Sequence, residues 1–171
     1  MKLFSFRTIK TIYLKLLRQK GTPESIARGV ASGFFIGFLI PIGFQTGLAI
    51  GLAFLLKAKK IPAAAATWIT NPVTVTFIYP VQCYVGARLL GQKFTFESIN
   101  EMISSFMEAP SVSSFAALGG NVILIFILGG LLFGVVSGVI SYFATLGMVE
   151  SYRRRKHMRL NKKLASQASK E

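Results

Sequence analysis

Three polar side chains, Thr67, Asn71 and Thr74, interrupt a long apolar stretch at a spacing that would put them on one face of a continuous helix. Gln45 and Thr46 lie in the apolar stretch before it. Amide groups are costly in an apolar environment unless they have a partner, so these side chains are expected to face protein, water or a ligand. The candidate substrate-binding residues are Arg28, Gln45, Thr46, Thr67, Asn71 and Thr74.

Arg28 is a charged residue close to the start of the first apolar stretch. A charge within hydrocarbon costs about 2.5–3.5 kcal/mol on insertion scales, so Arg28 is predicted to attract a phosphate or a lipid headgroup. Broken helices expose half-helix N-termini and free carbonyls, which transporters use to bind anions and ions. In the alternative interpretation, the polar groups only satisfy backbone atoms freed by prolines, and Arg28 reaches the membrane interface.

Residues suited to catalysis are scarce. His157, the one histidine, lies in a basic tail, and the six acidic residues fall at predicted helix ends, on surfaces or at the terminus. No nucleophile and base, and no paired carboxylates, are brought together by the sequence pattern. Cys83 is the one cysteine, so it is expected to be a small buried hydrophobe and not a metal ligand. We therefore predict no enzyme activity, no metal and no cofactor.

The composition is that of a membrane protein. Hydrophobic residues make up 52% of the chain and charged residues 15%, and the mean hydropathy is +0.54. Residues 30–56 and 118–148 carry no charge at all, and such runs are transmembrane candidates. The net charge of +14 comes from basic residues that flank apolar segments. This placement favours anionic lipid headgroups as partners over nucleic acid.

The predicted fold is all-α and integral to the membrane. Residues 1–20 form a basic amphipathic helix at the interface, retained because no signal-peptide cleavage site follows. The membrane domain, residues 21–150, begins at a helix start in Thr22-Pro23. It comprises a segment 26–56 broken at Pro41 and Gly43, a segment 61–90 broken at Pro72, a surface helix 95–109 and a transmembrane segment 118–148. Residues 151–171 form a basic cytoplasmic tail with frayed or disordered structure.

Glycines recur at every fourth residue in three series. This spacing leaves a flat groove on a helix, where a second backbone can approach closely. The predicted helix-packing glycines are Gly29, Gly33, Gly37, Gly47, Gly51, Gly130, Gly134 and Gly138. The chain has too few membrane segments to surround a substrate pathway alone, so we also expect a homo-oligomer.

Segment length and charge together predict the topology. As one helix, residues 26–56 would be about 46 Å long against a hydrocarbon core of about 30 Å. We therefore favour re-entrant hairpins for the 26–56 and 61–90 segments. The basic clusters before residue 21, at residues 57–60 and around residue 91 then share the cytoplasmic side. The cluster after residue 152 joins them if the last segment turns near Gly129 and Gly130, and both termini are then cytoplasmic.

Three segments carry a resemblance to a known family. TPESIA (residues 22–27), PIGFQT (41–46) and TWITNPVT (67–74) resemble, in that order and spacing, the bacterial membrane family called domain of unknown function 2062. The resemblance covers residues 10–150 and implies a protein of the bacterial cytoplasmic (inner) membrane. Similar sequences joined to glycosyltransferase-like domains imply envelope glycan or lipid chemistry, with envelope-synthesis proteins as partners.

Two functions follow as expectations. The first is a transporter, flippase-like or channel-like protein for a lipid-linked or small anionic substrate, with the two broken segments forming its site. The second is a non-catalytic membrane scaffold or accessory protein for cell-envelope glycan or lipid synthesis.

Overall fold

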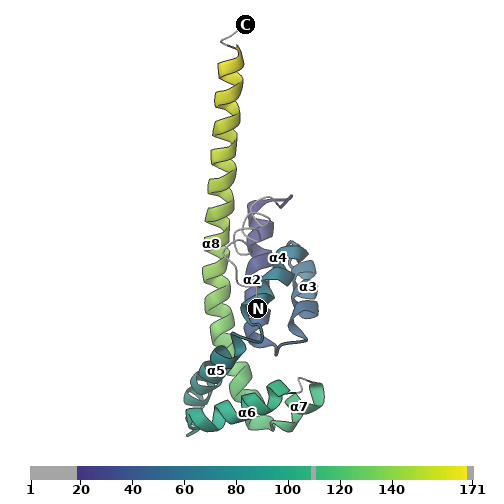
Figure 1. Ribbon diagram of the computed structural model, residues 1–171, viewed down its shortest axis with the longest axis vertical. Coiled ribbons are helices and arrows are strands. Elements are labelled where there is room, and N and C mark those ends of the chain that lie inside the picture. Colours follow the sequence, from purple (N-terminus) through teal and green to yellow (C-terminus); the bar gives the residue numbers. More distant parts are fainter. Residues whose placement is uncertain (1–18, 109–110, 169–171) are drawn as a thin grey trace.

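The computed structural model describes residues 19–108 and 111–168, and within these ranges the chain forms helices and turns with no strand (Figure 1). The elements are α2 (Pro23–Leu39), α3 (Gln45–Leu55), α4 (Lys60–Ala66), the 3-10 turn η1 (Thr67–Ile69), α5 (Val75–Leu89), α6 (Phe96–Glu108), α7 (Val112–Ala117) and α8 (Gly120–Ala168). The all-α fold class predicted from the sequence is confirmed. Residues 1–18 of the amphipathic helix predicted for residues 1–20 lie outside the described residues.

The start of α2 follows the predicted capping pattern. The backbone N–H of Ser25 donates to the Thr22 hydroxyl at 3.2 Å, Pro23 occupies the first helical position and Glu24 lies in the first turn. Each of these features satisfies or complements the free N–H groups at a helix N-terminus. The helix therefore begins where the sequence indicated.

The turn after α2 is made by Pro41 and Gly43. Ile40 is extended, as expected for a residue that precedes proline, and Gly43 has a φ of +102°, which favours glycine. α3 then returns along α2, and the backbone N–H of Lys59 donates to the Ser25 carbonyl at 2.9 Å. The two ends of the 26–56 segment therefore meet beside the N-terminus of α2.

The hairpin predicted for residues 61–90 is wrong. α4 packs against α2, where Gly33 adjoins the backbone of Ala63, whereas α5 packs against α8, where Gly86 adjoins the Ile125 carbonyl. Pro72 redirects the chain without returning it, because the partner of α5 lies about 40 residues further along the sequence. α5 and α6 share with α8 a core cluster that includes Tyr79.

The last helix is longer than predicted. α8 runs without a break from Gly120 to Ala168, so the chain does not turn at Gly129 and Gly130, and the tail is helical as far as residue 168. The prediction of a frayed tail was wrong because no glycine or proline follows Gly147 in the helix, and its Ala, Lys, Arg and Leu residues favour helix. Within the described ranges, α8 is the one helix long and apolar enough to cross a membrane. In Figure 1, its C-terminal part extends beyond the other helices.

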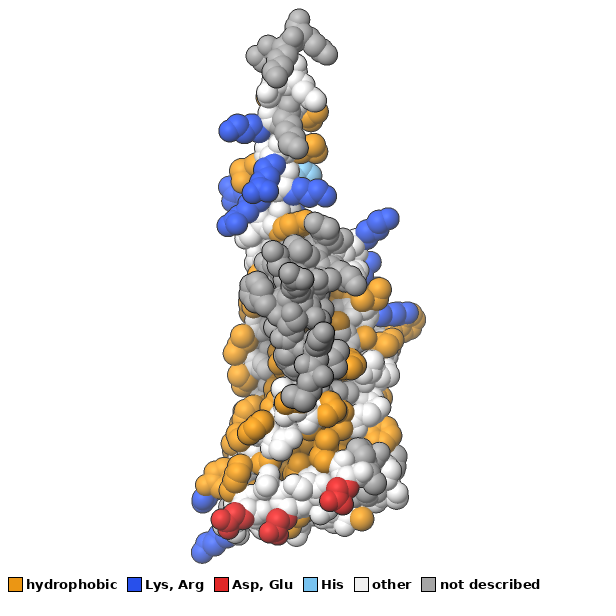
Figure 2. Space-filling model, in the orientation of Figure 1, with side chains coloured by type: hydrophobic (Ala, Val, Ile, Leu, Met, Phe, Trp, Pro, Cys, Tyr) orange, Lys and Arg blue, Asp and Glu red, His pale blue; other side chains and the backbone are white. Residues whose placement is uncertain are grey.

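The surface helix predicted for residues 95–109 is present as α6, whose buried face packs against α5. Three apolar side chains point inward and three acidic side chains outward; the former are Ile99, Ile103 and Phe106, and the latter Glu97, Glu101 and Glu108. Figure 2 shows acidic side chains gathered at the end of the molecule opposite the projecting part of α8.

The basic clusters lie at two ends of the molecule. Arg153 donates to the Gln19 carbonyl at 3.0 Å, and Val149 packs against Ile26, so the tail cluster and the start of α2 share one end. Ile125, beside α5, is 24 residues earlier on α8, which corresponds to about 36 Å. The residues after α5, including Lys93, therefore lie at the opposite end. The prediction that all the basic clusters share one side is wrong because the 61–90 segment does not turn back.

Candidate functional site

The two helix breaks meet inside the helical bundle through Gln45, the first residue of α3. Its side-chain amide donates to the carbonyls of Thr67 at 3.1 Å and Thr70 at 3.0 Å. The Thr70 hydroxyl lies 2.8 Å from the Gln45 side-chain oxygen, and all three residues are buried. Both amide hydrogens of Gln45 are therefore used within the chain, and α3 is joined to the turn between α4 and α5.

Thr46 extends this contact. The Thr67 hydroxyl donates to the Ala64 carbonyl at 2.8 Å, so the Thr46 hydroxyl, 3.2 Å away, is the donor between the two threonines. A hydroxyl has one hydrogen to donate and two lone pairs to accept. This order of donors therefore leaves the Thr46 oxygen able to accept a further bond.

Asn71 and Thr74 form a reciprocal pair that shapes the loop before α5. The Asn71 side-chain oxygen accepts from the backbone N–H groups of Val73 at 3.0 Å and Thr74 at 3.2 Å, and its amide donates to the Trp68 carbonyl at 3.2 Å. The Thr74 hydroxyl accepts from the Asn71 N–H at 2.9 Å and donates to the Ile69 carbonyl at 2.7 Å. These bonds satisfy backbone groups that Pro72 takes out of the helix.

The predicted common helix face of Thr67, Asn71 and Thr74 does not exist, because the helix ends before Pro72 and these residues lie in a 3-10 turn and a loop. The structure instead joins Gln45, Thr46 and Thr67, and places Asn71 and Thr74 in the adjacent loop. We call these five residues and Thr70 the break cluster. Polar side chains beside prolines were the signal that identified five of them.

Thr70 and Gln82 were not among the predicted site residues, although both are buried. The Thr70 hydroxyl also lies 2.9 Å from the Gly37 carbonyl, and the Gln82 amide donates to the carbonyls of Phe38 and Phe126, each at 3.0 Å. The last carbonyls of a helix have no partner within it. These two side chains therefore supply partners to the C-terminal end of α2.

Arg28 lies apart from the break cluster. Its guanidinium makes a long contact of 3.5 Å with the Lys57 carbonyl, and its buried Nε has no hydrogen-bond partner among the described residues. Arg28 instead lines an apolar groove between α2, α3 and α8. The six candidate binding residues therefore lie in two places. Arg28 of α2 borders the groove, and the other five residues belong to the break cluster.

Most of the predicted glycine contacts exist within the chain. Gly29 and Gly33 adjoin α4, and an added Cβ at Gly130 or Gly134 would lie 2.6 or 2.9 Å from carbonyls of α2. At Gly37 and Gly138 the approach is looser, at 3.4 Å. Gly47 and Gly51 make no such contact among the described residues: an added Cβ meets nothing within 4 Å, because the face of α3 that carries them points away from the rest of the chain.

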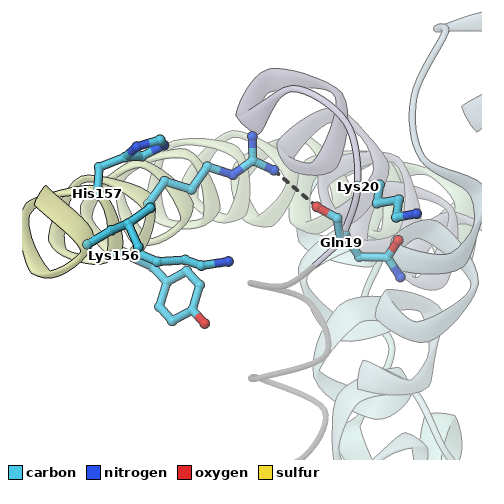
Figure 3. Close-up of a pocket in the computed structure, with 7 residues that line it drawn as sticks. Gln19, Lys20, Lys156 and His157 are labelled. Atoms are coloured by element: carbon cyan, nitrogen blue, oxygen red, sulfur yellow. Dashed lines mark hydrogen bonds between the residues drawn. The ribbon is translucent and has the colours of Figure 1, made fainter. Parts of the chain in front are cut away.

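A basic hollow of about 430 Å³ lies where the start of the described chain meets α8. Figure 3 shows Gln19 and Lys20 on one side and Lys156 and His157 on the other, with a dashed line for the hydrogen bond from Arg153 to Gln19. The tail and the start of α2 thus form one cationic surface. Within the described ranges, no three His, Cys, Asp or Glu side chains are grouped to hold a metal ion.

A family model matches residues 6–158, which include the break cluster, the groove and the first turns of the basic tail. Its description is an uncharacterized protein conserved in bacteria (DUF2062). The chain belongs to this family. The DUF2062 match ends inside α8, immediately after His157. Neither a curated protein nor a solved structure matches the chain.

Proposed function

We propose that this DUF2062 protein is an integral protein of the bacterial cytoplasmic membrane, with the basic end of the molecule in the cytoplasm. The level of Val149, at the start of α2, and the level of Ile125, beside α5, are about 36 Å apart along α8, which is close to the hydrocarbon thickness of about 30 Å. Large apolar side chains are exposed along α3, α5 and the first part of α8, as lipid-facing residues are. α2 and α3 then form a re-entrant hairpin, while α4 with α5, and α8, cross the bilayer.

Within that membrane, the function with most support is flippase-like or channel-like transport of a lipid-linked or small anionic substrate. The observation that carries it is the break cluster, a buried polar junction in an otherwise apolar bundle. Discontinuous helices with polar junctions build the substrate sites of many transporters. Here, side chains hold α3 to the turn after α4, so the helices can part at this junction while each keeps its own backbone hydrogen bonds.

The test is lipid movement in proteoliposomes containing phosphatidylglycerol with a fluorescent headgroup. Dithionite destroys the dye in the outer leaflet only, so vesicles without protein keep the inner-leaflet signal, and a working flippase lets that signal decay. Gln45→Leu and Asn71→Ala should stop the decay while the protein remains incorporated. Thr76→Val, which removes an exposed hydroxyl from α5, is the control and should transport normally. Retention of the inner-leaflet signal with the wild-type protein would contradict flippase activity.

A second candidate, the membrane scaffold, is favoured by the part of α8 that projects beyond the bundle. Its exposed basic residues include Arg154, Arg155 and Arg159, and this surface suits an acidic partner, such as an envelope-synthesis protein. Deletion of residues 154–171 distinguishes the two functions in a strain that depends on the gene. The scaffold candidate gains if this deletion abolishes complementation while Gln45→Leu complements fully; the opposite result supports transport.

A further inference from the structure

The groove that Arg28 lines has a floor of small residues and larger apolar walls. Its volume is about 460 Å³. Ala31, Gly134 and Gly138 leave it open where α2 meets α8, and Leu52 of α3 and Leu56 directly after it border the groove on one side. The exposed lining is almost entirely apolar, so Arg28 borders the groove chiefly with its aliphatic stem, and its guanidinium lies at the end near Lys57. Its shape and lining therefore suit a hydrocarbon chain better than a polar solute.

The length of the groove matches one leaflet of a bilayer. Its lining residues on α8 run from Gly134 to Phe143, which corresponds to about 14 Å along a helix. Half of a hydrocarbon core of about 30 Å is about 15 Å. The groove also runs along α2 and α8 from the basic end towards the level of the break cluster. A chain lying in it would have the same direction as the lipids around the protein.

The polar end of the groove is suited to a phosphate. Arg28 has a buried Nε without a partner and only one long contact for its terminal nitrogens among the described residues, so donors of its guanidinium remain free. Guanidinium groups bind phosphate through charge-assisted hydrogen bonds. Lys57 and Lys59 lie at the same end and favour a headgroup with net negative charge over a zwitterionic one.

We propose that this groove holds an anionic phospholipid, with its phosphate on Arg28 and one acyl chain between α2, α3 and α8. The proposal rests on the membrane location given under Proposed function and names the substrate class for which the transport candidate has most support. The lipid enters sideways from the cytoplasmic leaflet, because the groove is open along its length. Its chain end then points towards the break cluster.

The experiment measures lipid adducts on the full-length protein by native mass spectrometry in detergent, with phosphatidylglycerol or phosphatidylcholine added. Phosphatidylglycerol should bind in preference, and Arg28→Gln should reduce its binding about tenfold, the loss expected for a charged hydrogen bond. Arg28→Lys should retain part of it. Lys60→Gln, which removes an exposed charge at the same end but outside the groove, should leave the binding unchanged.

A matched pair of variants on α8 tests the acyl-chain position. Val135 lines the groove and is 48% exposed, whereas its neighbour Val136 does not line it and is 50% exposed. Val135→Trp should fill the groove and abolish binding of phosphatidylglycerol, and Val136→Trp should not. Equal binding by the two tryptophan variants would overturn the proposal. Equal binding of the two lipids, unaffected by Arg28→Gln, would overturn it as well.

The binding and transport assays separate failure of this site from failure of the proposed function. If Val135→Trp loses phosphatidylglycerol binding while the wild-type protein does not move the lipid, the groove is a lipid site and the transport candidate fails. If the wild-type protein moves the lipid and Val135→Trp does so equally well, the substrate follows another route and the groove proposal fails.

Discussion

The hydroxyl of Thr70 lies within 3.1 Å of three oxygens, on Gly37, Gln45 and Thr67, and joins α2, α3 and η1. Thr70→Val keeps the shape of the side chain but removes the one hydroxyl hydrogen, which leaves a buried acceptor unpaired. We expect it to lower the free energy of unfolding by about 1–3 kcal/mol, measured by SDS titration from mild detergent micelles.

Two other variants make this a test of the hydroxyl. Thr70→Ser retains it and should recover most of the stability, and Thr76→Val removes an exposed hydroxyl and should change stability by less than about 0.5 kcal/mol. If Thr70→Val were as stable as the wild-type protein, the break cluster would not hold the helices together.

At this scale, the sequence identified the types of the important residues but not their partners. Gln45 and Asn71 stood out because amides are rare in apolar segments, and both are engaged beside a proline break. Gln82 carried the same signal, but its partners belong to α2 and α8, each 44 residues away in the sequence. No local spacing encodes so distant a pairing.

Among the helices, two glycines allow a direct comparison, because one is packed against another helix and the other faces open space. Gly33→Ala places a Cβ against the backbone of Ala63 and should destabilise the α2–α4 contact by about 1–3 kcal/mol. Gly51→Ala meets open space on α3 and should stabilise the helix by about 0.5–1 kcal/mol. The two changes are chemically identical, so opposite signs of the stability change in the SDS titration are the expected result.

Destabilisation by Gly51→Ala would instead mean that a second copy of the chain packs against this face. Chemical crosslinking of the wild-type protein and of Gly51→Leu in membranes checks the predicted homo-oligomer. Loss of a crosslinked dimer in the variant alone would indicate that α3 forms the contact.

Helix boundaries set by local chemistry were predictable, and those set by distant packing were not. Thr22 and Pro23 start α2, and Pro41 and Gly43 end its run, as the sequence indicated. The tail of α8 was mispredicted because a polar, charged composition was read as disorder, although it contains no helix breaker. The hairpin at 61–90 failed because Pro72 reveals that a helix ends but not where the next one goes.

For the whole molecule, the separation of the basic clusters predicts a topology that labelling can test. In a Cys83→Ala background, single cysteines replace Lys59, Lys93 and His157. An impermeant thiol reagent added outside intact cells should label only position 93, because the end near α6 carries far fewer Lys and Arg residues than the opposite end. Labelling of position 59 from outside, or protection of position 93, would contradict this orientation.

Overall shape was the least predictable level. Charge counting in the sequence placed every cluster on one side, and this failed for residues near Lys93 because it assumed two hairpins that turn back. The gathering of the tail cluster and Gln19 at one end was predicted, but through a turn in the last segment that does not exist. One straight helix produces the same result, since α2 and α8 run in opposite directions.

The unbroken course of α8 has a geometric meaning for anything attached to its tip. From Glu150 to Ala168 the helix continues for 18 residues, which corresponds to about 27 Å of rigid rise and five turns. A partner bound there would be held at a fixed distance from the bundle and at a fixed angle around the axis of α8. Inserting a single residue after Glu150 would move the partner by about 1.5 Å along the helix axis but rotate it by about 100° around that axis. The position of the partner is therefore more sensitive to helical rotation than to helix length.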